Sequence, residues 1–96
     1  MLILVTYDVS TQTAAGRTRL RKVAKVCQNY GVRVQNSVFE CIVDATQLSI
    51  MKKELDDMIN KDTDSLRFYN LGNKYKSKVE HVGAKESIQV EEPLIF

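Results

Sequence analysis

The sequence predicts one α+β domain in which a single antiparallel sheet is covered by two helices. Three features indicate this fold: an apolar first strand, two segments with helical periodicity, and three further short stretches rich in β-branched and aromatic residues. The 96 residues suffice for one two-layer core, and 44% hydrophobic with 27% charged residues is typical of a folded chain. No apolar run approaches the roughly 20 residues of a membrane span. The start MLILVTYD is unlike a signal peptide, so we expect a cytoplasmic protein with no membrane partner.

The first strand is expected over residues 2–7 and leads directly into Asp8. Apolar side chains on both of its faces are typical of a central strand that is covered above and below. A polar loop over 9–16 follows, and then an amphipathic helix that Gly31 is placed to end. The apolar face of this helix comprises Leu20, Val23, Ala24, Cys27 and Tyr30.

The second half of the plan starts with VRVQNSVFECIVD, which predicts two strands joined by a tight turn at 35–37. A second helix is indicated by an apolar stripe that consists of Leu48, Met51, Leu55, Met58 and Ile59. Asp44 and Gln47 precede it at capping-box spacing, and SLRFYNL then alternates as a fourth strand. The order strand–helix–strand–strand–helix–strand is the ferredoxin-like plan, with sheet order 4-1-3-2 and both helices on one face.

This plan leaves one face of the sheet and the end of the chain unexplained. Because both helices cover the same face, the apolar second face of the first strand is expected to meet a second copy of the chain, in a symmetric dimer packed through the sheet faces. The chain then divides into a ferredoxin-like domain over 1–78 and a tail over 79–96. The tail predicts an extra C-terminal strand, and its apolar end at 94–96 should pack on a partner or add to a sheet edge.

Basic residues are concentrated in the first part of the chain. Residues 1–39 hold six Lys or Arg against one Asp, whereas residues 40–96 hold eight against eleven Asp or Glu. The basic residues of the first helix are Arg17, Arg19, Arg21, Lys22 and Lys25. Positions 17, 21 and 25 are four apart and form a stripe, with the other two on neighbouring faces. They are candidates for contacts with a phosphate backbone, and the alternative is an ordinary solvated helix face.

Asp8 is the candidate centre of chemistry. We expect it at the same edge of the sheet as the turn at 35–37, where it either caps the polar loop behind it or binds a divalent metal. Mg²⁺ takes one or two protein carboxylates together with waters and phosphate oxygens. The second carboxylate would come from Asp8 of a second copy, or in cis from Asp62 or Asp64. Asp44 is excluded because the antiparallel third strand carries it to the opposite edge.

A metal at Asp8 would permit nuclease chemistry without histidine, since it lowers the pKa of a bound water and stabilises charge on the leaving oxygen of a phosphodiester. The only histidine, His81, is expected to be a surface or partly packed side chain. Cys27 and Cys41 lack the spacing of a zinc or redox site and are expected to be buried thiols. Tyr7 and Phe39 either stack on a nucleic-acid base or belong to the core.

Three strings of the sequence together resemble a known family: YDV at 7–9, RLRKV at 19–23 and RVQNSVFE at 33–40. With them the chain resembles the CRISPR-associated protein two family, a core adaptation subunit of prokaryotic antiviral immunity. The tail strings LGNKYKSKVEHVG and PLIF are similar to those of members found with type I-C systems. The resemblance implies a ferredoxin-like fold, a symmetric homodimer and a tail strand that pads the dimer.

The resemblance also implies an activity and partners. It implies cleavage of single-stranded RNA or duplex DNA with Mg²⁺, or with Mn²⁺ as an alternative, assigned to the acid at the end of the first strand, here Asp8. Members of the family bridge two dimers of the integrase, CRISPR-associated protein one, and help hold the DNA that becomes a new spacer. The further positions that match the family are Arg33, Ser37 and Phe39, with Tyr7 beside the acid and with Arg19 and Arg21 approximating the helix arginines.

Three functions therefore stay open. The first is a metal-dependent endonuclease centred on two copies of Asp8. The second is a non-catalytic scaffold that binds duplex DNA and the integrase through the basic stripe. The third is a toxin-like ribonuclease of the same fold without a role in immunity.

Overall fold

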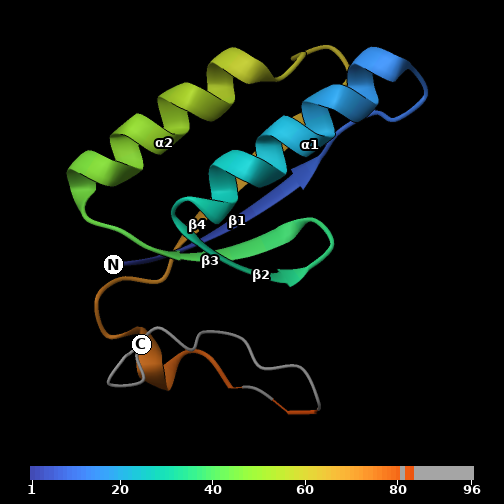
Figure 1. Cartoon of the computed structure of the whole chain (residues 1–96). Coiled ribbons are helices and arrows are strands. Elements are labelled where there is room, and N and C mark those ends of the chain that lie inside the picture. Colours follow the sequence, from blue (N-terminus) through green and yellow to red (C-terminus); the bar gives the residue numbers. More distant parts are fainter. Residues whose placement is uncertain (81, 84–96) are drawn as a thin grey trace.

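The computed structural model describes residues 1–80 and 82–83 and has the predicted α+β architecture (Figure 1). The elements in chain order are β1 (Leu2–Asp8), α1 (Ala14–Gln28), β2 (Gly31–Gln35), β3 (Val38–Ile42), α2 (Ala45–Met58), β4 (Ser65–Asn70) and a 3₁₀ turn (Tyr75–Ser77). Both helices lie on one face of the sheet, as the ferredoxin-like plan requires (Figure 1). Among the described residues no helix is long and apolar enough to cross a membrane.

The four strands are antiparallel and follow the order β2-β3-β1-β4, which confirms the predicted sheet order. β1 is therefore central, with β3 on one side and β4 on the other. Val5, in the middle of β1, lies opposite Phe39 of β3 and Phe68 of β4. At the end of β1, Asp8 lies opposite Ser65.

The core lies between the sheet and the two helices. Alternate residues of β1 point into it, because successive side chains of a strand face opposite sides. The fully buried members of the core are Ile3, Val5, Val23, Cys27, Phe39, Cys41, Met51 and Leu55. Both cysteines are free thiols, as predicted, and burial raises the pKa of Cys27 to about 12 and that of Cys41 to about 11.

The two helix starts differ in how well the sequence predicted them. α2 begins as expected: the Asp44 carboxylate accepts from Gln47 N at 2.7 Å, and the Gln47 side chain accepts from Asp44 N at 2.9 Å. α1 begins at Ala14, inside the predicted loop over 9–16. It starts early because Thr13 serves as its N-cap and accepts from Gly16 N at 3.0 Å.

Gly31 has a different role from the predicted one. The helix ends at Gln28, three residues earlier, and Gly31 is the first residue of β2. A Cβ at this position would overlap the carbonyl oxygen of Glu40 and lie 2.7 Å from the Cys41 sulfur. The glycine is therefore required by the close approach of β2 to β3 and not by the end of the helix.

The face of the sheet away from the helices carries the described part of the C-terminal tail (Figure 1). Leu71 N donates to Leu2 O and Leu2 N donates to Gly72 O, both at 2.9 Å, so the chain continues beside the start of β1 before it crosses this face. The face expected to meet a second copy is thus covered in part by the chain itself. The predicted C-terminal strand and the apolar end at 94–96 lie outside the described residues.

Candidate functional site

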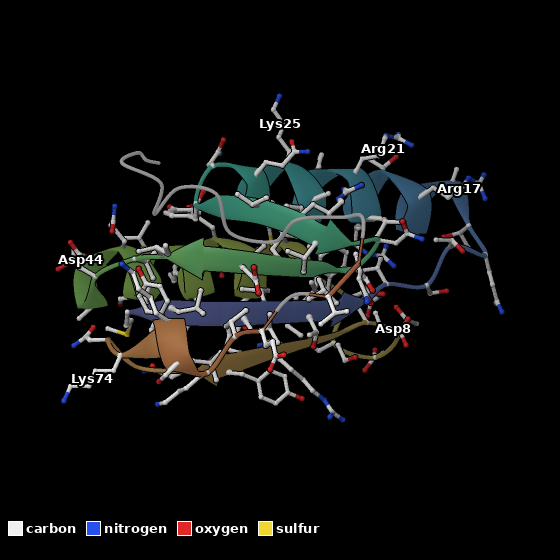
Figure 2. The ribbon with its side chains drawn as sticks, turned by 90° about the horizontal axis from the view of Figure 1, so that it is seen from below. Asp8, Arg17, Arg21, Lys25, Asp44 and Lys74 are labelled. Atoms are coloured by element: carbon white, nitrogen blue, oxygen red, sulfur yellow. The ribbon has the colours of Figure 1, made fainter. Side chains whose placement is uncertain are left out.

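Asp8 stands at one edge of the sheet with an exposed side chain (Figure 2). Strand alternation turns Tyr7 into the core and Asp8 toward the face opposite the helices. Asp8 lines a shallow pocket of about 280 Å³, and the other lining residues are Thr6, Tyr7, Ser65, Arg67 and Tyr69. Within residues 1–80 and 82–83 its carboxylate accepts no hydrogen bond and forms no ion pair. Among the described residues, Asp8 therefore does not cap the loop that follows β1.

The loops predicted to gather at this edge do so. The backbone N–H of Tyr7 donates to Ser37 O at 3.1 Å, and the Tyr7 hydroxyl donates to Asn36 O at 3.2 Å, so the β2–β3 turn lies beside the end of β1. Ser10 N donates to the Asp64 carboxylate at 3.1 Å, which adds the loop before β4. Asp44 lies at the other end of the sheet, as expected (Figure 2).

Asp64, which the sequence left open as a second metal ligand, is already saturated. Its side chain has no exposed surface, and Arg19 Nε donates to one carboxylate oxygen at 2.8 Å. The same carboxylate accepts from Ser10 N, Asn60 N at 3.0 Å and the Thr63 hydroxyl at 3.0 Å. Arg19 first, and then these donors, hold the pKa of Asp64 well below its ordinary value of 3.8. The described residues contain no group of three or more His, Cys, Asp or Glu that could hold a metal, and Asp8 is the one acid among the residues that line its pocket.

Arg19 was predicted to contact phosphate, and the structure places it elsewhere. Its guanidinium forms the ion pair with Asp64 and donates to the Thr63 hydroxyl at 3.4 Å, with 21% of the side chain exposed. It therefore joins α1 to the loop before β4, and on the helix face next to the basic stripe it is already paired with Asp64. The physical reason is its position two residues from Arg17 and Arg21, which turns it away from them on the helix.

The remaining basic residues of α1 are exposed, and Arg17, Arg21 and Lys25 follow one side of the helix (Figure 2). Arg17 Nη1 donates to Thr11 O at 3.1 Å, next to the loop that leaves β1. Lys22 is exposed as well.

A groove of about 660 Å³ lies between α1 and β2 and brings Arg21 and Lys25 together with Arg33. Its other lining residues are Tyr7, Leu20, Ala24, Gln28 and Asn36, so it contains three cations and no acid. The Arg33 guanidinium lies 5.3 Å from the centre of the Phe39 ring, and this cation–π contact restricts its position. We call this surface the α1–β2 groove.

Tyr7 and Phe39 belong to the core, which decides between the two interpretations of these rings. Phe39 is fully buried, Tyr7 is 5% exposed, and their ring centres are 6.2 Å apart at an interplanar angle of 26°. Neither ring is open to a base. Burial is also the main reason that the pKa of Tyr7 is raised, although Arg33 lowers it in part.

Sequence reasoning missed two residues that line the Asp8 pocket, Arg67 and Tyr69 of β4. Arg67 is opposite Thr6 in register and is exposed. The alternation of side chains along β4 could have revealed them. Leu66 and Phe68 pack against the core, so residues 65, 67 and 69 lie on the opposite face, which is the face of Asp8. Arg67 places a cation at the pocket that contains the exposed acid.

Comparison of the chain with known protein families and structures supports the family resemblance. The family model described as CRISPR associated protein Cas2 matches residues 1–79. The CRISPR-associated endonuclease Cas2 of Halalkalibacterium halodurans is 67% identical over 96 residues, which cover all of both chains. The CRISPR-associated endoribonuclease Cas2 of Chlorobaculum tepidum is 56% identical over the same full length. The crystal structure of Streptococcus pyogenes Cas2 at pH 6.5 has a TM-score of 0.76 and 54% identity, covering 86% of this chain and 100% of that one.

Proposed function

Because the chain belongs to the CRISPR-associated protein Cas2 family, we propose that it is a metal-dependent endonuclease of a CRISPR adaptation system, in which Asp8 from each of two copies forms one centre. Its relatives carry the names endonuclease and endoribonuclease, so the chain is a nuclease. The observation that carries the rest is Asp8 itself: an exposed carboxylate without a partner among the described residues, at the end of the central strand. Family membership favours this role over a toxin-like ribonuclease.

The donor set fits Mg²⁺, and a second chain would raise the number of Asp8 carboxylates at the ion from one to two. A Mg²⁺ ion binds through one or two carboxylates, waters and phosphate oxygens, and each chain supplies Asp8 while Asp64 is committed to Arg19. In the proposed homodimer, two sheets pack through the faces away from the helices, which the tail covers in part, and this packing would bring the second Asp8 to the ion. When bound, Mg²⁺, or Mn²⁺ in its place, would activate a water and stabilise charge on the leaving oxygen. Arg67 stands at the same pocket and is placed to bind a phosphate oxygen of the scissile strand.

Removal of the metal tests this proposal directly. The parent chain is incubated with matched single-stranded RNA and duplex DNA, in Mg²⁺, in Mn²⁺ and with a chelator. We expect cleavage in either metal and none in the chelator, with recovery when Mg²⁺ is restored, because the metal would lower the pKa of the attacking water and stabilise charge on the leaving oxygen. The two substrates decide between RNA and DNA. Cleavage that continues unchanged in the chelator would contradict a metal centre.

A second role is favoured by the α1–β2 groove. The groove lies on the helix side of the sheet, whereas Asp8 faces the other side. The three cations of the groove are suited to bind the phosphates of a nucleic acid. Arg17 and Lys22 are also exposed on α1, so duplex DNA bound at the groove would have further cations of this helix within reach. We propose that this surface holds DNA during spacer acquisition with the integrase, CRISPR-associated protein one.

Charge reversal in the groove separates holding from cutting. The double variant Arg21→Glu, Lys25→Glu is expected to bind duplex DNA more weakly, and the salt dependence of binding should become shallower by about one unit of slope for each phosphate that the variant no longer neutralises. The measurement is DNA affinity at a series of salt concentrations. The double variant Lys52→Glu, Lys53→Glu on α2 makes the same change in net charge outside the groove and should retain the parental slope. Equally weakened binding in both variants would mean that only net charge matters.

A further inference from the structure

One buried carboxylate ties together the segments that surround Asp8. Asp64 accepts hydrogen bonds from Ser10 in the loop that leaves β1, from Asn60 after α2, and from Arg19 of α1. Its side chain has no exposed surface, and its bond to Arg19 is the shortest of these, at 2.8 Å. The pair therefore joins the loop after β1 and α1 to the loop before β4, which follows Ser10 by 54 residues and Arg19 by 45.

The same contacts bracket Asp8 on both sides. Ser65 is the residue opposite Asp8 in the sheet, and its neighbour Asp64 holds Ser10, two residues after Asp8. α1 also approaches this loop closely, because a Cβ on Gly16 would overlap the carbonyl oxygen of Ser10. The backbone that follows Asp8, up to Ser10, is thus held between α1 and the start of β4.

Stability alone does not explain an ion pair with a fully buried carboxylate at this place. The desolvation of two charges offsets much of their attraction, and apolar side chains of similar volume often stabilise a fold as well or better. The pair also fixes the orientation of the Asp64 carboxylate. Arg19 donates through Nε to one oxygen at 2.8 Å and through Nη2 to the other at 3.4 Å, so both oxygens are held toward the loops.

We propose that Arg19 and Asp64 are positioning residues that fix the exit of β1 and thereby the direction of the Asp8 carboxylate. The inference rests on the proposed nuclease centre at Asp8. Neither residue touches the substrate; they act through the backbone of residues 8–10. Small displacements of a reacting group are costly, since an error of about 1 Å can reduce a rate by about a hundredfold.

The test compares Asp64→Asn and Arg19→Gln with Asp44→Asn. Asp64→Asn keeps the size of the side chain, Arg19→Gln shortens it, and both remove the charge pair. Asp44→Asn alters the cap of α2 at the opposite end of the sheet. All are assayed well below their melting temperatures, so that the rate per folded molecule is measured. We expect Asp64→Asn and Arg19→Gln to lower kcat by about tenfold or more and to raise the Mg²⁺ concentration for half-maximal cleavage. Asp44→Asn should change neither quantity, even where it lowers the melting temperature.

The amide of Ser10 gives a readout that does not depend on activity. Its hydrogen exchange should become faster in Asp64→Asn and in Arg19→Gln and stay at the parental rate in Asp44→Asn. If one of the first two variants fails to fold, the other still decides. Parental kcat and metal dependence in a folded variant, beside an inactive Asp8→Asn chain, would overturn the positioning role and leave the proposed function standing. Parental cleavage by Asp8→Asn would remove the proposed function, and this inference with it.

Discussion

Asp8→Asn is expected to abolish metal-dependent cleavage while the chain stays folded and dimeric. Asparagine has nearly the same shape but lacks the negative charge with which a carboxylate attracts Mg²⁺. The loss should be about a hundredfold or more, because a metal contributes several kcal/mol to the transition state and each 1.36 kcal/mol is a factor of ten. The fold should be unaffected, since the exposed Asp8 side chain makes no hydrogen bond or ion pair with the described residues. Cleavage of RNA and duplex DNA, the melting temperature and the molar mass in solution check this together.

Asp62→Asn is the matched control for this experiment. Asp62 is exposed in the loop before β4 and was the other acid that could have supplied the second carboxylate in cis. If the second ligand comes from another copy of Asp8, Asp62→Asn cleaves at the parental rate. Full activity of Asp8→Asn, or loss of activity in Asp62→Asn, would show that the centre is not a symmetric pair of Asp8 side chains.

Much of the arrangement around Asp8 could be predicted, because the pattern of residues along a strand shows where in the sheet the strand lies and which residues share a face. β1 is apolar on both faces, which placed it in the centre of the sheet, and the antiparallel order then put Asp8 and the turn at 35–37 at one end and Asp44 at the other. The capping box of α2 is local in sequence and was found correctly. These features depend on neighbours in the chain or on a two-residue period, both of which the sequence displays directly.

The parts that could not be predicted depend on contacts between distant segments. The loop behind Asp8 needed a hydrogen-bond acceptor, and Asp64, 54 residues after Ser10, supplies it instead of Asp8. Helix spacing placed Arg19 on a different face from Arg17 and Arg21, but it could not show that Arg19 pairs there with the buried carboxylate of Asp64. Gly31 likewise follows the helix in sequence, although its function is set by β3 across the sheet.

A charge on the face of the sheet away from the helices should separate the two subunits of the proposed dimer and stop cleavage. Val38 begins β3, is half-buried, and lies opposite Thr6, two residues before Asp8. If the two-fold axis passes near Asp8, the two copies of Val38 lie close together, and Val38→Lys places like charges in a desolvated interface. We expect monomers by analytical ultracentrifugation and cleavage as low as that of Asp8→Asn. Ile50→Lys is the control, because Ile50 is 51% exposed on α2 and the new charge there stays in solvent.

Mixing two variants shows whether the loss comes from separation of the subunits or from damage to each chain. Val38→Glu should also be monomeric and inactive when alone, and an equal mixture with Val38→Lys should form a heterodimer through opposite charges and regain cleavage. The added charges cancel near Asp8 in the mixture, so a direct electrostatic effect on the metal is removed as an explanation. A Val38→Lys monomer that cleaves like the parent would mean that a single chain holds the complete centre. An inactive mixture of folded heterodimers would mean that Val38 acts on cleavage by some route other than dimer formation.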